Sequence, residues 1–450
     1  MDILTSPDPT RHPIPRPPRP KSAVSHGVGL AGLVGLVIWI FGARLINATH
    51  PEFDLGGKWY SFGAVAVSGI PMVLWSVFVD KVHRNPTTGI DWDAPAKPWR
   101  ETIGLSLTKL AGLWTTWIAL MAIYWFVRFY HNGNYQFALD VFRYGALPLF
   151  ILSVPYVIWV DTRLTEPRDG AWALGSWLMG EQKADWDAIN AHLRAWSVKG
   201  FFCAFMISIL PGGYHNVITQ PWNAVVTNIV PCTNWLIDFM FVIDVYLATT
   251  GYVLTCKPLD AHIRSATPYT AGWVSALLCY PPVALYMIDY KVATLDWFYW
   301  LDPIAPEHAW GSAGSFAFWA QVVTRDGLAA LLVMLTAIYA WATMAFGIRF
   351  SNLTDRGIMT HGPYAWTKHP AYLSKNLFWW LVALPFLVTS HSWTDAIRNC
   401  AMLLCVNGIY YWRARTEEWH LRNDPTYVAY EAWMAEYGVI TSRLRRLLGF

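Results

Sequence analysis

Residues 326–347 read DGLAALLVMLTAIYAWATMAFG, and this stretch is typical of a helix that crosses a membrane. An α-helix rises about 1.5 Å per residue, so a run of this length covers the roughly 30 Å of hydrocarbon in a bilayer. Its only charged residue, Asp326, lies at one end of the run. This part of the chain is therefore suited to the bilayer core.

Similar apolar runs recur along the chain. We predict about ten spans, at roughly 25–43, 60–79, 104–127, 142–160, 198–214, 232–255, 270–289, 326–347, 376–393 and 396–412. The last two are short and closely spaced, which predicts a helical hairpin. The composition agrees, because 14% of the residues are charged, whereas a soluble domain carries about a quarter. We expect an all-α, polytopic integral membrane bundle, in a bacterial inner membrane or the endoplasmic reticulum.

The distribution of Lys and Arg predicts the orientation. If the N-terminus is cytoplasmic, most of the Lys and Arg residues in the loops fall on the cytoplasmic side, where these residues are enriched. This group includes Arg349, Arg356 and Lys375, which we interpret as topology signals. The pattern predicts an even number of spans with both termini in the cytoplasm. The net charge of +3 indicates no nucleic-acid partner.

Three regions differ in composition. Residues 1–24 are rich in Pro and Arg, which predicts a disordered cytoplasmic tail. Residues 25–325 form an N-terminal multi-span membrane region whose loops carry no recognisable chemistry. Residues 326–450 carry polar and titratable side chains in two short cytoplasmic segments, so we expect a catalytic module there. The six cysteines form no CxxC pair, which predicts buried thiols and no metal site.

The first polar segment, residues 361–372, reads HGPYAWTKHPAY and lies between two predicted spans. Gly362 and Pro363 predict a turn, and Pro370 suits the first turn of the next helix. Lys368 and His369 therefore come just before a helix N-terminus, where free amides and the helix dipole attract an anion.

The second polar segment, residues 413–421, reads RARTEEWHL and directly follows the last predicted span. Arg413 and Glu417 are four residues apart and share one helix face, with Glu418 about 100° further round. Either segment alone is more typical of a solvated face or a membrane anchor. Their occurrence on both sides of one hairpin favours a functional site.

The order of these features resembles a known family. A Gly-x-Tyr turn precedes His-Pro-x-Tyr, a membrane hairpin follows, and Arg-x-x-x-Glu-Glu-x-x-Leu leads to Tyr-x-x-Tyr at 427–430. This order is similar to the isoprenylcysteine carboxyl methyltransferases and the related membrane phospholipid methyltransferases, over about residues 326–450. At Lys368 the family usually has Arg, whose bidentate fork Lys lacks.

The resemblance implies an S-adenosylmethionine pocket at the cytoplasmic membrane face, with a lipid or lipidated acceptor that enters from the bilayer. It also implies two groups of site residues. Arg413 and Glu417 would be catalytic. The cofactor would bind Gly362, Tyr364, Lys368, His369, Pro370, Tyr372, Glu417 and Glu418.

Two other functions remain open from the sequence. A steroid 5α-reductase-like or sterol reductase-like enzyme that uses NADPH also ends in a cytoplasmic hairpin with a Pro-Tyr turn. A non-catalytic membrane carrier or scaffold would suit the long N-terminal region. No GxGxxG motif opens a βαβ unit, so the soluble methyltransferase fold is not expected.

Two acids, Asp238 and Asp244, lie inside a predicted span, where an ionisable residue is a functional candidate. Six residues correspond to about 600° of helix rotation, so the two acids do not share a face. We expect one of them to line an acceptor cavity and the other to be paired or close to an interface.

Overall fold

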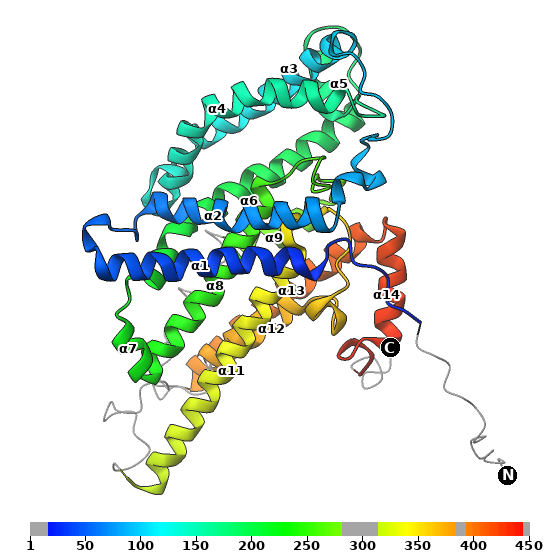
Figure 1. Ribbon diagram of the computed structural model, residues 1–450. Helices are drawn as coiled ribbons and strands as arrows, with labels where there is room; N and C mark the ends of the chain where they lie inside the picture. Colours follow the sequence, from blue (N-terminus) through cyan, green and yellow to red (C-terminus); the bar gives the residue numbers. More distant parts are fainter. Residues whose placement is uncertain (1–16, 281–313, 384–392, 444–450) are drawn as a thin grey trace, which may run out of the picture.

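A computed structural model describes residues 17–280, 314–383 and 393–443, and these are mainly helical (Figure 1). One short antiparallel pair joins β1 (Ser265–Ala266) to β2 (Thr354–Asp355). The helices are α1 (His26–Thr49), α2 (Lys58–Leu74), α3 (Trp99–Phe126), α4 (Gln136–Asp161), α5 (Gly170–Leu178), α6 (Trp186–Thr219), α7 (Trp222–Thr227), α8 (Ile229–Val253), α9 (Thr270–Leu277), α11 (Phe316–Phe346), α12 (Pro370–Ala383), α13 (Trp393–Leu421) and α14 (Pro425–Tyr437).

Seven helical segments in the described residues are long and apolar enough to cross a membrane. They are His26–Thr49, Lys58–Val79, Trp99–Phe126, Gly133–Asp161, Trp186–Thr219, Ile229–Val253 and Phe316–Arg349. The quoted stretch 326–347 lies in the last of them, and the prediction of an all-α membrane protein agrees with this set. The predicted spans 270–289 and 376–393 lie partly outside the described residues, so the number of ten stays a prediction.

Helix α8 is central in the bundle (Figure 1). It contacts α1, α2, α6 and α11, and it is the most buried of the seven candidate spans. Gly251 near its end permits a close approach, because a Cβ there would lie 2.8 Å from the backbone oxygen of Phe350. Helix α8 thus brings the N-terminal region directly against α11 and the loop that follows it.

Helices α3, α4 and α5 form a lobe at one end of the bundle (Figure 1). Its interior holds Lys109, whose ammonium lies 2.6 Å from a carboxylate oxygen of Asp161 and 3.2 Å from one of Asp169. A charge buried in an apolar bundle requires such partners. This ion-paired cluster is therefore structural.

A buried ion pair fixes the loop between α11 and α12. The Asp260 carboxylate, in the loop after α8, accepts a hydrogen bond from Arg349 at 2.6 Å. Asn85 and Thr87, in the loop before α3, donate to the same carboxylate at 2.9 and 2.8 Å. Asp260 therefore joins three loops that are far apart in the sequence, and we call this set the Asp260 hub.

The segment 17–25 runs along the loop before α12. The backbone amide of Ala23 donates to the carbonyl of Ile358 at 2.9 Å. The hydroxyl of Ser22 and Nδ1 of His361 form a hydrogen bond of 2.7 Å. Residues 22 and 23 of the predicted disordered tail therefore have hydrogen-bond partners in the C-terminal part of the chain, whereas residues 1–16 lie outside the described residues.

Candidate functional site

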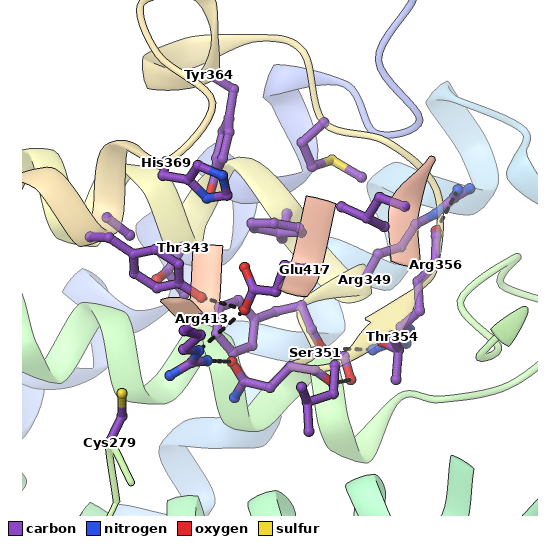
Figure 2. Close-up of a pocket in the computed structure, with 18 of the residues that line it drawn as sticks. Cys279, Thr343, Arg349, Ser351, Thr354, Arg356, Tyr364, His369, Arg413 and Glu417 are labelled. Atoms are coloured by element: carbon purple, nitrogen blue, oxygen red, sulfur yellow. Dashed lines mark hydrogen bonds and ion pairs between the residues drawn. The ribbon is translucent and has the colours of Figure 1, made fainter. Parts of the chain in front are cut away.

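A cavity of about 350 Å³ lies where α6, α8, α11, α12 and α13 meet (Figure 2). Its wall contains both polar segments predicted from the sequence, and it also contains side chains of the N-terminal region, such as Phe205 of α6 and Asp244 of α8. The cavity therefore joins the two regions of the chain.

The turn before α12 places the first polar segment at the cavity. Gly362 opens a short helix, η10 (Gly362–Ala365), and has a φ of 59°, a conformation that glycine adopts without strain. A Cβ at Gly362 would also lie 3.2 Å from Nε1 of Trp341. Helix α12 then begins at Pro370, as predicted, so Lys368 and His369 lie at its N-terminus.

Glu418 joins the second polar segment to this turn. One carboxylate oxygen lies 2.7 Å from the ammonium of Lys368 and 3.0 Å from Nε2 of His369, and the other accepts from Arg415 at 2.6 Å. Lys368 also pairs with Glu431 of α14 at 2.8 Å. The side chain of Glu418 is only 4% exposed, so these basic side chains enclose it. Glu418 therefore acts as a clamp between α13 and the turn.

This clamp makes stability depend on pH. Burial alone would raise the pKa of Glu418, which lies beyond the predicted span 396–412, but the hydrogen bonds and charges of His369 and Lys368 outweigh burial and lower the pKa from 4.5 to about 2. A lowered pKa means that the stabilisation is present above pH 4.5 and is lost as the pH falls toward 2.

We therefore expect the unfolding free energy of the wild type to decrease more steeply between about pH 5 and 3 than that of Glu418→Gln, in denaturant titrations in detergent. Glu436→Gln, at an exposed position of α14, is the matched control and should follow the wild type. Equal slopes for the wild type and Glu418→Gln would show that the clamp is not the source of the pH dependence.

Glu417, the neighbouring acid, lines the cavity instead (Figure 2). It lies 3.2 Å from Nε of Arg413 and accepts a hydrogen bond from the hydroxyl of Tyr372. Its side chain is 20% exposed, whereas that of Arg413 is 5% exposed. Arg413 also donates to the side-chain oxygen of Asn352 at 2.6 Å. The Glu417 carboxylate is thus held in place and keeps an accessible side toward the cavity.

The predicted site residues divide into two groups. Six of them line the cavity, namely Tyr364, Lys368, His369, Tyr372, Arg413 and Glu417. The other three, Gly362, Pro370 and Glu418, lie behind the cavity wall and shape the turn and the clamp. The two segments that lie about 50 residues apart in the sequence are therefore brought together.

One of the two intramembrane acids, Asp244, faces this cavity. Its carboxylate accepts hydrogen bonds from Thr343 and Tyr339 of α11 and is close to the charge of Lys375. Asp238, on the other side of α8, pairs with Asn216 of α6. This agrees with the expectation that the two acids point in different directions.

Aromatic rings connect Asp244 with the turn before α12. The Lys375 ammonium lies 5.5 Å from the ring centre of Tyr339 and 5.7 Å from that of Tyr410. The ring of Tyr410 lies 5.5 Å from that of Tyr372, which stacks on His369 at 5.5 Å. The cavity therefore has an outer end at His369 and Glu417 and an inner end at Asp244 and Lys375.

The sequence interpretation missed several residues of the inner end. From the sequence, Lys375 is interpreted only as a topology signal, and Tyr339 and Tyr410 lie in apolar runs without any motif. Lys375 comes directly before the predicted span 376–393, and a cation at the edge of an apolar run was the one available signal, because it needs a partner or a polar cavity.

Comparisons with known proteins agree with the geometry for the C-terminal part of the chain. No curated protein matches the chain, and no solved structure matches it. The predicted resemblance is confirmed by a family model: residues 327–423, which contain the turn, the predicted hairpin and the Arg413–Glu418 segment, match the isoprenylcysteine carboxyl methyltransferase (ICMT) family.

Proposed function

We propose that this protein is an integral membrane methyltransferase that moves a methyl group from S-adenosylmethionine to a membrane-embedded lipid or lipidated acceptor at the cytoplasmic face. The observation that carries the proposal is the meeting of the two polar segments, both of which lie in the ICMT-matching residues 327–423, in one cavity. Neither segment would form a site alone.

The outer end of the cavity fits the chemistry of this cofactor. S-adenosylmethionine carries an ammonium and ribose hydroxyls, and the Glu417 carboxylate can accept hydrogen bonds from either. The faces of Tyr364 and Tyr372 offer π-systems to a sulfonium or an adenine ring. The cofactor carboxylate would bind near Lys368 and His369 at the N-terminus of α12. When bound, the cofactor supplies an electrophilic methyl group.

The protein's own residues contribute position rather than reactive groups at this end. Glu418 fixes the turn relative to α13 through Lys368 and His369. Arg413 fixes the Glu417 carboxylate. Fixed binding groups hold two reactants in line, which can account for a large share of a transfer rate.

The proposal predicts which of two cofactor-related ligands stabilises the protein. We expect S-adenosylhomocysteine to raise the thermal unfolding midpoint of the detergent-purified protein, because a ligand at 100 times its dissociation constant adds about 2.7 kcal/mol. NADPH, tested in parallel, should cause no shift. A shift with NADPH alone would support a reductase, and no shift with either ligand would support a carrier.

A further inference from the structure

We propose that the inner end of the cavity binds the head of an amphipathic acceptor that carries a hydroxyl group, and that Asp244 accepts the proton of this hydroxyl during transfer. The inference rests on the proposed function and adds a substrate class. It also gives the N-terminal region a role, since Asp244 lies outside the residues that match the ICMT family.

The position of Asp244 is unusual for a structural acid. It lies nine residues before the end of α8, which is roughly 14 Å into the helix. Its side chain belongs to the cavity wall although the residue is only 6% exposed. Placing an acid at this depth is costly, and such residues usually serve a pathway or a reaction.

The charges at the inner end select a neutral head group. Asp244 and Lys375 both face this end and carry opposite charges. A carboxylate head would be attracted by Lys375 but repelled by Asp244, and an ammonium head would meet the reverse, so the two charges offset each other and leave the cost of burying a charged head uncompensated. A hydroxyl avoids this cost and can hydrogen-bond with both.

Apolar side chains form part of the wall at the inner end of the cavity. Phe205, Met206 and Ile209 of α6 line it on one side, and Phe241 and Val245 of α8 line it near Asp244. Burying an alkyl or isoprenoid chain against such side chains is favourable by about 25 cal/mol per Å². The inner end therefore suits a molecule with an apolar body and one small polar head.

The inner and outer ends lie within reach of one molecule. Tyr372 links them, because it donates to Glu417 and its ring contacts that of Tyr410, next to Lys375. An acceptor head near Asp244 can thus approach a methyl donor held at Glu417 without leaving the cavity.

The cavity supplies a proton acceptor for the proposed transfer. The acceptor oxygen forms a bond to the methyl carbon while the carbon–sulfur bond breaks, and the electron pair of that bond stays on sulfur. The hydroxyl proton passes to the carboxylate of Asp244. The products are a methyl ether, S-adenosylhomocysteine and a protonated Asp244, which returns its proton to water after product release. No oxidant or reductant is required.

The first test measures binding and needs no natural acceptor. Hexadecanol, hexadecanoate and hexadecylamine share one chain and differ in the head group. Each is added to the full-length protein saturated with S-adenosylhomocysteine, and the thermal midpoint is recorded. We expect hexadecanol to bind at least tenfold more tightly than the other two. Asp244→Asn should lose this preference, and Asp238→Asn, the matched control on the same helix, should keep it.

The results of this test decide whether the inner end prefers a hydroxyl head group. Stronger stabilisation by hexadecanoate or hexadecylamine, no stabilisation by hexadecanol, or an unchanged preference in Asp244→Asn would each overturn the proposal. A wild type that S-adenosylhomocysteine itself does not stabilise would instead contradict the proposed function.

The second test identifies the product. The wild type is incubated with methyl-labelled S-adenosylmethionine and a bacterial membrane lipid extract, and the labelled lipid is treated with base. An ether keeps its label, whereas a methyl ester releases it as methanol. We expect base-stable label on oxygen and about 100-fold slower transfer by Asp244→Asn, the usual order for loss of a proton acceptor, with unchanged binding of S-adenosylhomocysteine. Base-labile label, label on nitrogen, or no labelled lipid would refute the assignment.

Discussion

Replacing Glu417 by glutamine is expected to weaken the binding of S-adenosylhomocysteine by about 10- to 100-fold. The carboxylate is the accessible acid at the outer end of the cavity, and it is positioned by Arg413 and Tyr372. A hydrogen bond that involves a charged group contributes about 1.5–3 kcal/mol, and 1.4 kcal/mol corresponds to a factor of ten in affinity. Isothermal titration in detergent measures this change directly.

The same substitution removes the ion-pair partner of Arg413, so its effect on folding must be measured separately. Arg413 keeps its contact with Asn352 at 2.6 Å, and we therefore expect the ligand-free variant to remain folded with a lower thermal midpoint. Glu436→Gln, exposed on α14, should leave both the affinity for S-adenosylhomocysteine and the thermal midpoint unchanged. Wild-type affinity in Glu417→Gln would mean that this carboxylate does not contact the cofactor.

Replacing Arg349 by leucine is expected to lower the unfolding free energy by about 3–5 kcal/mol, because it leaves a buried charge without its main partner. The side chains of Asp260 and Arg349 are 0% and 2% exposed and lie 2.6 Å apart. The loop that they fix carries Asn352, which contacts Arg413, so cofactor affinity should decrease as well. Denaturant titration in detergent micelles measures the first effect.

A double variant separates charge from packing at the Asp260 hub. Asp260 has a φ of 50°, a left-handed conformation that Asn tolerates well. Combining Arg349→Leu with Asp260→Asn removes both buried charges, so part of the lost stability should return. Arg84→Leu, at an exposed position of a neighbouring loop, should have little effect. Strictly additive losses in the double variant would show that the two charges do not depend on each other.

Local patterns in the sequence predicted the parts of the structure that depend on local physics. The run 326–347 predicted α11, because apolar length alone identifies a helix suited to the bilayer. Pro370 predicted the start of α12, because its ring fits the first helical turn. The spacing of Arg413 and Glu417 predicted their contact, since helix geometry places residues four apart on one face.

Other features depend on tertiary contacts that no local pattern contains. Glu417 and Glu418 are adjacent and chemically alike, yet only the first lines the cavity, because the rotation of α13 against the turn decides which acid is enclosed. Likewise, the spacing of Asp238 and Asp244 predicts that they lie on different faces of one helix. It does not predict which face borders the cavity, because that depends on how α11 and α12 pack against α8. Arg349 looked like a topology signal because its partner Asp260 is 89 residues away.

The contact between Ser22 and His361 has a consequence for how the protein is made. The two residues are 339 positions apart, although their side chains form a direct hydrogen bond. At the usual rate of about 5–20 residues per second, a ribosome needs roughly 20–70 seconds to synthesise the intervening chain. During this interval Ser22 and Ala23 have not yet met His361 and Ile358, and the seven candidate spans of the described residues all precede these partners in the chain. Docking of this segment is therefore a late assembly event, and it brings the residues before α1 onto the loop that precedes the turn at Gly362.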